Sequence, residues 1–179
     1  MRRLLCLPLA AIACLVAGLA LTTPARGEDA TGGDKAVPEA LRVGDGQRVV
    51  LRTTGVGVQV YDCVDGAWRF REPVATLGRG KAPLGIHFAG PTWQSLADGS
   101  RVAGRVLASV PARRADRDIP WLLLQATATA GAGVFGDVTF VQRLRTAGGV
   151  APAGTCDPAT QPSTAVPYRA LYVFWAPAV

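Results

Sequence analysis

The sequence predicts an all-β fold, an antiparallel β-sandwich or barrel of roughly nine strands with one disulfide. Asp-Gly and Gly-Gly pairs, which favour tight turns, recur at residues 45–46, 65–66, 98–99 and 148–149. Short runs rich in Val, Leu, Thr and aromatic residues lie between these pairs, and helical periodicity is nearly absent. In chain order the runs predict strands close to residues 48–53, 57–64, 67–72, 84–88, 92–97, 100–110, 120–129, 138–145 and 168–175.

Residues 1–27 have the organisation of a secretory signal peptide, in which two arginines precede an apolar run over residues 4–21. A membrane anchor is the first alternative because this run is just long enough to span, but Pro8 interrupts it and no basic cluster follows. A lipoprotein attached at Cys14 is the second, although the residues after Cys14 stay apolar. We expect cleavage, no transmembrane anchor afterwards, and a secreted, extracellular or cell-envelope location.

Removal of residues 1–27 leaves 152 residues (179 − 27) and 16 basic against 13 acidic side chains, a net charge of +3. No Lys/Arg stripe is interleaved with aromatic residues, so we expect no nucleic-acid partner. Residues 28–40 are rich in Gly, Asp, Ala and Pro and predict a flexible lead-in. Residues 41–179 have the length of a single β-rich domain.

The turn at Asp65-Gly66 predicts a hairpin with a fixed register, because a two-residue loop leaves one way of pairing the strands. The predicted pairs are Val64 with Ala67, Cys63 with Trp68, Asp62 with Arg69, and Tyr61 with Phe70. One face then carries the aromatic residues and Cys63 and belongs in a core. The other face carries an ion pair between Asp62 and Arg69.

Cys63 and Cys156 are the two cysteines left after cleavage, and we expect them to form a disulfide. Cys156 lies in a Pro/Gly-rich stretch, residues 148–167, which has too little apolar periodicity to fold unless it is fastened to the body. Closing a loop of this length stabilises by roughly 4–5 kcal/mol at most in the chain-entropy model. The alternative is two free buried thiols. A disulfide indicates an oxidising compartment outside the cytoplasm.

Two runs near the middle and end of the chain predict where the core lies. Residues 119–124 are apolar at both parities, which indicates a central strand covered on both faces. Residues 138–144 alternate instead, and Gln142 falls on the apolar side with Phe140 and Leu144. A buried glutamine is either a hydrogen-bonded core amide or a polar group in the wall of a pocket.

The inventory of reactive side chains argues against an enzyme. His87 is the only histidine, and no Gly-x-Ser-x-Gly turn presents a nucleophilic serine. A transition-metal site needs several His, Cys or Met ligands, which the chain lacks after cleavage, so we expect no metal. No glycine-rich turn joins a strand to a helix, so we expect no dinucleotide and no other cofactor.

A binding module fits the residues better than catalysis. His87 alternates with its apolar neighbours, and Trp93 follows after the next turn, so an aromatic ring beside an imidazole is predicted to hold a glycan or a small apolar ligand. Gln142 or Arg143 is the expected polar support. The competing interpretation makes Trp93 a core residue and His87 a hydrogen-bonded structural residue.

Two other functions remain open at this point. The first is an exported polysaccharide hydrolase that uses Glu72 and Asp137, the two acids without a ready structural explanation. The second is a structural protein without a small ligand. The binding module, most simply a non-enzymatic extracellular or cell-envelope protein, is the main prediction.

Several short motifs, in this order, resemble an uncharacterised secreted family, domain of unknown function 3455. The motifs are Tyr61-Asp62-Cys63, Gly85-Ile86-His87, Pro91-Thr92-Trp93, Ile119-Pro120-Trp121-Leu122-Leu123, Gly133-Val134-Phe135 with Gln142-Arg143, and Thr155-Cys156-Asp157. The resemblance spans about residues 41–175. It implies an exported β-rich domain, and it implies no activity and no functional residue.

Overall fold

The computed structural model describes residues 37–78 and 82–178. The predicted signal peptide and residues 28–36 lie outside the described residues. After a short 3₁₀ helix, η2 (Glu39–Leu41), the described part contains eight strands: β1 (Gln47–Val64), β2 (Ala67–Leu77), β3 (Gly85–Phe88), β4 (Thr92–Ser95), β5 (Arg101–Val110), β6 (Trp121–Ala130), β7 (Phe140–Gly148) and β8 (Ser163–Pro177). None of the helical segments in this part of the chain is long and apolar enough to cross a membrane.

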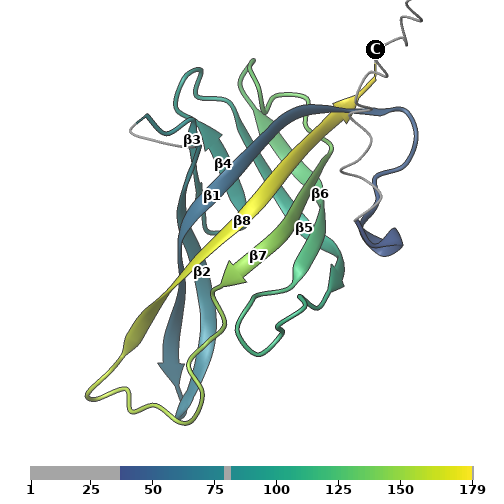
Figure 1. The fold of residues 1–179 in the computed structure, drawn as a ribbon. Helices are drawn as coiled ribbons and strands as arrows, with labels where there is room; N and C mark the ends of the chain where they lie inside the picture. Colours follow the sequence, from purple (N-terminus) through teal and green to yellow (C-terminus); the bar gives the residue numbers. More distant parts are fainter. Residues whose placement is uncertain (1–36, 79–81, 179) are drawn as a thin grey trace, which may run out of the picture. The chain divides into compact units, whose positions relative to one another are not determined.

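Each strand pairs antiparallel with the next one, and β8 pairs with β1, so the sheet closes into a barrel. Figure 1 shows β1 and β8 side by side along the front of this barrel. The predicted all-β class is therefore confirmed, in its barrel form. An eight-stranded barrel has an interior just wide enough to be filled by side chains or to hold one small ligand.

Residues 37–78 and 82–178 form eight strands where the sequence predicted nine, because residues 48–53 and 57–64 belong to one continuous strand, β1. The glycines at this junction, Gly55 and Gly57, do not make a turn. A Cβ atom on Gly55 would lie 2.5 Å from the Tyr172 ring, and one on Gly57 would lie 2.1 Å from the Val74 carbonyl oxygen. These glycines therefore allow neighbouring groups to come close to the strand.

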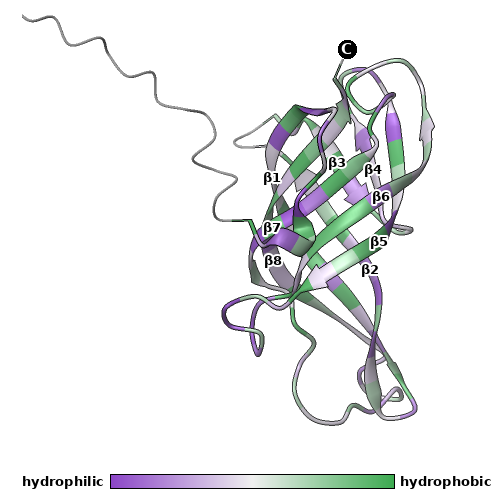
Figure 2. Ribbon diagram, turned by 90° about the vertical axis from the view of Figure 1, so that its right-hand side faces the viewer, coloured by the Kyte–Doolittle hydropathy of each residue, from purple (hydrophilic) through white to green (hydrophobic). Residues whose placement is uncertain are grey.

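Two apolar clusters cover the two faces of the sheet. The larger cluster lies inside the barrel and includes Leu122, Leu124 and Phe174. The smaller one lies outside, where Leu41 and Val37 of the segment around η2 pack against Leu123, Leu144 and Val173. Apolar and polar residues alternate along many of the strands (Figure 2). The prediction that residues 119–124 are covered on both sides is correct, because their alternate leucines enter different clusters.

The described residues begin at Val37, four residues before the predicted start of the domain at residue 41. Val37 and Leu41 are buried in the outer cluster. Gln142 fastens this segment, since its Nε2 donates to the Leu41 carbonyl oxygen at 2.6 Å and its Oε1 accepts from Trp175 Nε1 at 2.9 Å. Gln142 is therefore a buried, hydrogen-bonded amide, and it also lines a small pocket with Arg42 and Val43.

The hairpin around Asp65-Gly66 has the predicted register in all four pairs. The predicted ion pair between Asp62 and Arg69 is wrong. Asp62 pairs instead with Arg71, whose Nη1 lies 2.9 Å from Asp62 Oδ1. The register shifts at Val60/Tyr61, so that Tyr61 faces Phe70 while Val60 faces Glu72, and Arg71 is the extra residue of a β-bulge. A bulge redirects side chains, and this one brings Arg71 to Asp62.

Cys63 and Cys156 form the predicted disulfide, with 93 residues of sequence separation. Backbone hydrogen bonds flank it, from Cys63 N to the Pro162 oxygen and from Cys156 N to the Gly66 oxygen. The long connection between β7 and β8 is thereby held against the end of the β1–β2 hairpin, as Figure 1 shows at the lower end of the barrel.

Candidate functional site: a cavity inside the barrel

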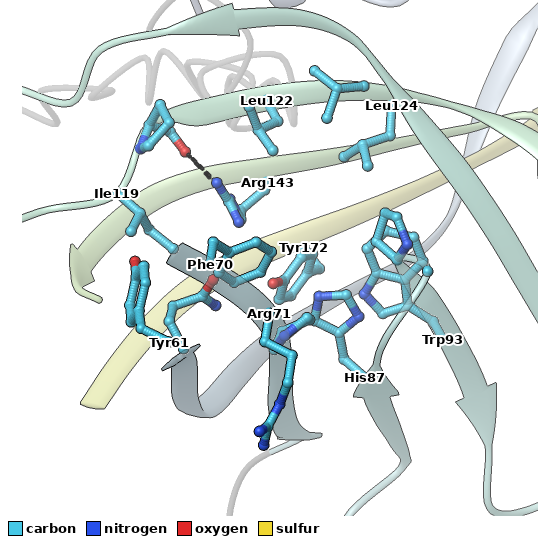
Figure 3. A pocket seen from close by; sticks show the side chains of 16 residues that line it. Tyr61, Phe70, Arg71, His87, Trp93, Ile119, Leu122, Leu124, Arg143 and Tyr172 are labelled. Atoms are coloured by element: carbon cyan, nitrogen blue, oxygen red, sulfur yellow. Dashed lines mark hydrogen bonds between the residues drawn. The ribbon is translucent and has the colours of Figure 1, made fainter. Parts of the chain in front are cut away.

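A cavity of about 300 Å³ occupies the barrel interior (Figure 3). All eight strands contribute to its lining, and so do the β3–β4 and β5–β6 connections. The lining residues are Gln59, Tyr61, Phe70, Arg71, Pro73, His87, Gly90, Pro91, Trp93, Val106, Ile119, Pro120, Leu122, Leu124, Arg143 and Tyr172. Its size lies at the lower end of the range for small-molecule sites.

The cavity opens beside the short β3–β4 hairpin. Each of these two strands has four residues, so only residues 75–77 of β2 and 101–103 of β5 pair with them. The remaining parts of β2 and β5 flank an opening whose lining residues Phe70 and Val106 are 54% and 50% exposed. At this mouth Arg71 pairs with both Asp62 and Glu72, so its charge is compensated.

One wall of the cavity is aromatic. The His87 and Trp93 rings are stacked, with centroids 4.4 Å apart and planes 1° from parallel, and both make T-shaped contacts with the Tyr172 ring. Strand pairing explains the stack, because His87 and Trp93 face each other across β3 and β4. Each ring is almost fully buried, at 3% and 1% exposure.

His87 is neutral at neutral pH. Burial lowers its pKa from 6.5 to about 4, against a smaller opposing effect of its hydrogen bond to Thr92. The ring nitrogen Nδ1 lies 2.8 Å from the Thr92 carbonyl oxygen, which can only accept, so Nδ1 carries the proton. The other ring nitrogen, Nε2, is then a hydrogen-bond acceptor.

Three tyrosine hydroxyl groups lie in the same region. Tyr61 donates to the Gly149 carbonyl oxygen, and the Tyr168 and Tyr172 hydroxyls are 3.1 Å apart. Burial raises the pKa of all three side chains above the usual value. They therefore stay protonated at neutral pH and supply no negative charge.

Arg143 points into the cavity from β7 (Figure 3). It lies in one row with Leu122 of β6 and Tyr172 of β8, its direct partners across the sheet. Its Nε and Nη2 donate to the Pro120 carbonyl oxygen at 3.2 and 3.1 Å. Burial lowers its pKa, but a guanidinium remains protonated in proteins.

Two buried donors in the cavity wall have no hydrogen-bond partner among the described residues: Gln59 Nε2 and Trp93 Nε1. Gln59 is 2% exposed. An unpaired buried donor costs about 1–3 kcal/mol, so native proteins rarely leave one without a water or ligand to accept from it. Both donors belong to residues that line the cavity.

The structure brings together some of the predicted site residues and separates others. His87, Trp93 and Arg143 all line the cavity, whereas Gln142 is the outward neighbour of Arg143 and does not. Sequence reasoning missed Gln59 and Tyr172. Gln59 stands in a run of alternating valines, and this polar residue on one side of β1 was a usable signal. No such signal marks Tyr172, which stands in a run of apolar residues.

Glu72 and Asp137 do not form a catalytic pair. Glu72 faces Val60 near the far end of β1, while Asp137 is exposed and stands two residues before Thr139, which hydrogen-bonds Gln47 at the start of β1. Val60 and Gln47 are thirteen positions apart, or roughly 40 Å along the strand. Glycosidase carboxyl groups lie about 5–10 Å apart, so the predicted pairing is wrong.

Comparison with known proteins identifies one family. A family model described as "Protein of unknown function (DUF3455)" matches residues 78–176, more than half of the chain. No curated protein and no solved structure gave a significant match. The described residues contain no group of three or more His, Cys, Asp or Glu side chains that could hold a metal ion.

Proposed function

The chain belongs to the DUF3455 family of proteins of unknown function, and we propose that it is a non-enzymatic binding module that holds one small, largely apolar ligand inside its barrel. The observation that carries this proposal is the cavity of about 300 Å³ with unpaired buried donors in its wall. A barrel that served only as a structural element would gain stability by filling this space.

The cavity favours a small apolar ligand over a glycan. Trp93 is 1% exposed and His87 covers one face of its indole, so it offers no open platform for a sugar ring. Leu122, Leu124 and Ile119 supply the apolar surface instead. A polysaccharide chain needs an open groove, which an interior of this volume does not provide.

We also propose that the domain works outside the cytoplasm. The disulfide between Cys63 and Cys156 supports this, because such bonds persist in oxidising compartments. Thiol alkylation followed by mass measurement tests it. Protein collected outside the cells of its native host should carry both cysteines oxidised and lack the N-terminal apolar segment, whereas protein found only in the cytoplasm with two free thiols would refute the location.

Two tryptophan substitutions on β5 test the cavity as the binding site. Val106 lines the cavity, whereas its neighbour Leu107 is equally exposed, at 50%, and does not. We expect 2-naphthoic acid, 2-naphthamide or decanoic acid to bind the wild type with one-to-one stoichiometry in calorimetric titrations. Val106→Trp should weaken this binding by about tenfold or more, since the indole occupies the mouth, and Leu107→Trp should change it by less than about twofold.

The glycan chitohexaose serves as the contrasting probe in the same titrations. We expect it not to bind. Saturable binding of chitohexaose, with no binding of any of the three apolar probes, would show that the interior is not the site. Equal weakening by Val106→Trp and Leu107→Trp would place the bound probe on the outer surface of β5.

A further inference from the structure

Arg143 is a partly buried cation whose charge no carboxylate balances within the described part of the chain. The ion pairs found there join Arg71 to Asp62 and Glu72, and Arg114 to Asp118. The two arginines of the cavity therefore differ. Arg71, at the exposed mouth, has two carboxylate partners, whereas Arg143, in the interior, has the uncharged Pro120 carbonyl and Tyr172 hydroxyl.

The guanidinium keeps free donors for a ligand. Of its five N–H groups, two are directed at the Pro120 oxygen, and the guanidinium also hydrogen-bonds the Tyr172 hydroxyl, which leaves at least two (5 − 3) for a ligand. The contact with Pro120 also fixes the plane of the group. A planar fork held in this way suits a carboxylate, which accepts two parallel N–H bonds.

The neighbours of Arg143 add donors and no negative charge. Tyr172 faces it directly across β7 and β8, and its hydroxyl is shared with Tyr168. When Tyr168 donates to Tyr172, the Tyr172 proton is free to point into the cavity. The unpaired Nε2 of Gln59 is a further donor in the lining. Burying a cation without a counter-charge is costly, so this arrangement favours an anionic ligand.

The other lining residues determine the shape and polarity of the rest of that ligand. Leu122 and Leu124 form one side of the space, and the stacked rings of Trp93 and His87 form another (Figure 3). His87 is neutral and so adds no second positive charge. The interior thus combines one cationic point with apolar and aromatic surface. Inorganic phosphate or sulfate would pair with the cationic point but would leave the apolar and aromatic surface without a contact.

We infer that the cavity selects an amphipathic monocarboxylate with a compact apolar body, whose carboxylate is bound by Arg143 with support from Tyr172 and Gln59. This inference rests on the proposed function and specifies its ligand class. The apolar body lies against Leu122, Leu124 and the His87–Trp93 stack.

The test compares 2-naphthoic acid with 2-naphthamide, which has the same ring and no charge. With the oxidised full chain at pH 7, we expect calorimetry to show the acid binding about tenfold or more tightly than the amide. Arg143→Gln should weaken acid binding by about ten- to a hundredfold and bring the two affinities together. Arg145→Gln removes the same charge from an exposed neighbour on β7 and should leave both affinities unchanged.

The outcomes separate this inference from the proposed function. Equal affinity of the wild type for acid and amide would overturn the carboxylate subsite and leave the binding module standing. Binding of neither probe would count against the binding module itself. The comparison of the two probes on the wild type needs no variant, so it decides the question even where Arg143→Gln does not fold. An equal loss in Arg145→Gln would show a general charge effect and overturn the role of Arg143.

Discussion

Replacing Cys63 and Cys156 together by serine should lower the free energy of unfolding by about 2–5 kcal/mol and the melting temperature by about 5–15 °C. The bond closes a separation of 93 residues, so its loss returns much conformational freedom to the unfolded chain. Thermal unfolding followed by circular dichroism measures the effect. We also expect weaker ligand binding, because the bond fastens the loop that carries Gly149, the acceptor for the Tyr61 hydroxyl in the cavity wall.

A reductant provides the matched control for this variant. Reduced wild type should unfold at the same temperature as the double serine variant, and the variant should not respond to reductant. If the double variant instead melts with the oxidised wild type, the loop is held by its backbone contacts to the hairpin, namely those of Cys63 with Pro162 and of Cys156 with Gly66. The disulfide would then have no measurable part in stability.

Local patterns predicted the local structure well. The Asp65-Gly66 turn alone gave the register of the first hairpin, because a two-residue loop admits one pairing. The pattern of residues 119–124 predicted a strand covered on both faces, because apolar residues occupy both odd and even positions. In the structure they enter the two different clusters. The prediction from the sequence pattern is wrong at Gly55 and Gly57. The pattern indicates a break between two strands there, but these glycines allow Tyr172 and Val74 to pack closely against one strand. That role depends on strands distant in sequence.

The same limit applies to the site. Phe140, Gln142 and Leu144 define an apolar face of β7, so the opposite face, with Arg143, resembles a solvent-exposed one. In the barrel both faces are covered: the segment around η2 covers the apolar face, and the barrel encloses the other. Only closure of the sheet by β8 against β1 places Arg143 inside. Closure of the barrel depends on pairing between strands that are distant in sequence, so it cannot be predicted from the alternation of residues along one strand.

Acidification from pH 7 to pH 4.5 should remove about 2–3 kcal/mol of stability through His87 alone. Burial depresses the pKa of His87 to about 4 in the folded protein, from 6.5 in the unfolded chain. Between these values the unfolded chain binds more protons, so His87 supports the fold fully above about pH 6.5 and progressively less as the pH falls toward 4. Urea unfolding at a series of pH values measures this slope.

The window isolates His87, because it is the only histidine of the chain. Hydrogen bonds from Ser100 and Val134 depress the pKa of Asp98 to about 2, so that group destabilises the fold chiefly below the window. The variant His87→Asn keeps a side-chain N–H near the Thr92 carbonyl and does not titrate. Its stability should be lower at pH 7 but nearly constant down to pH 4.5. An unchanged slope in this variant would assign the acid sensitivity to other groups. A vanished slope would assign the acid sensitivity to His87.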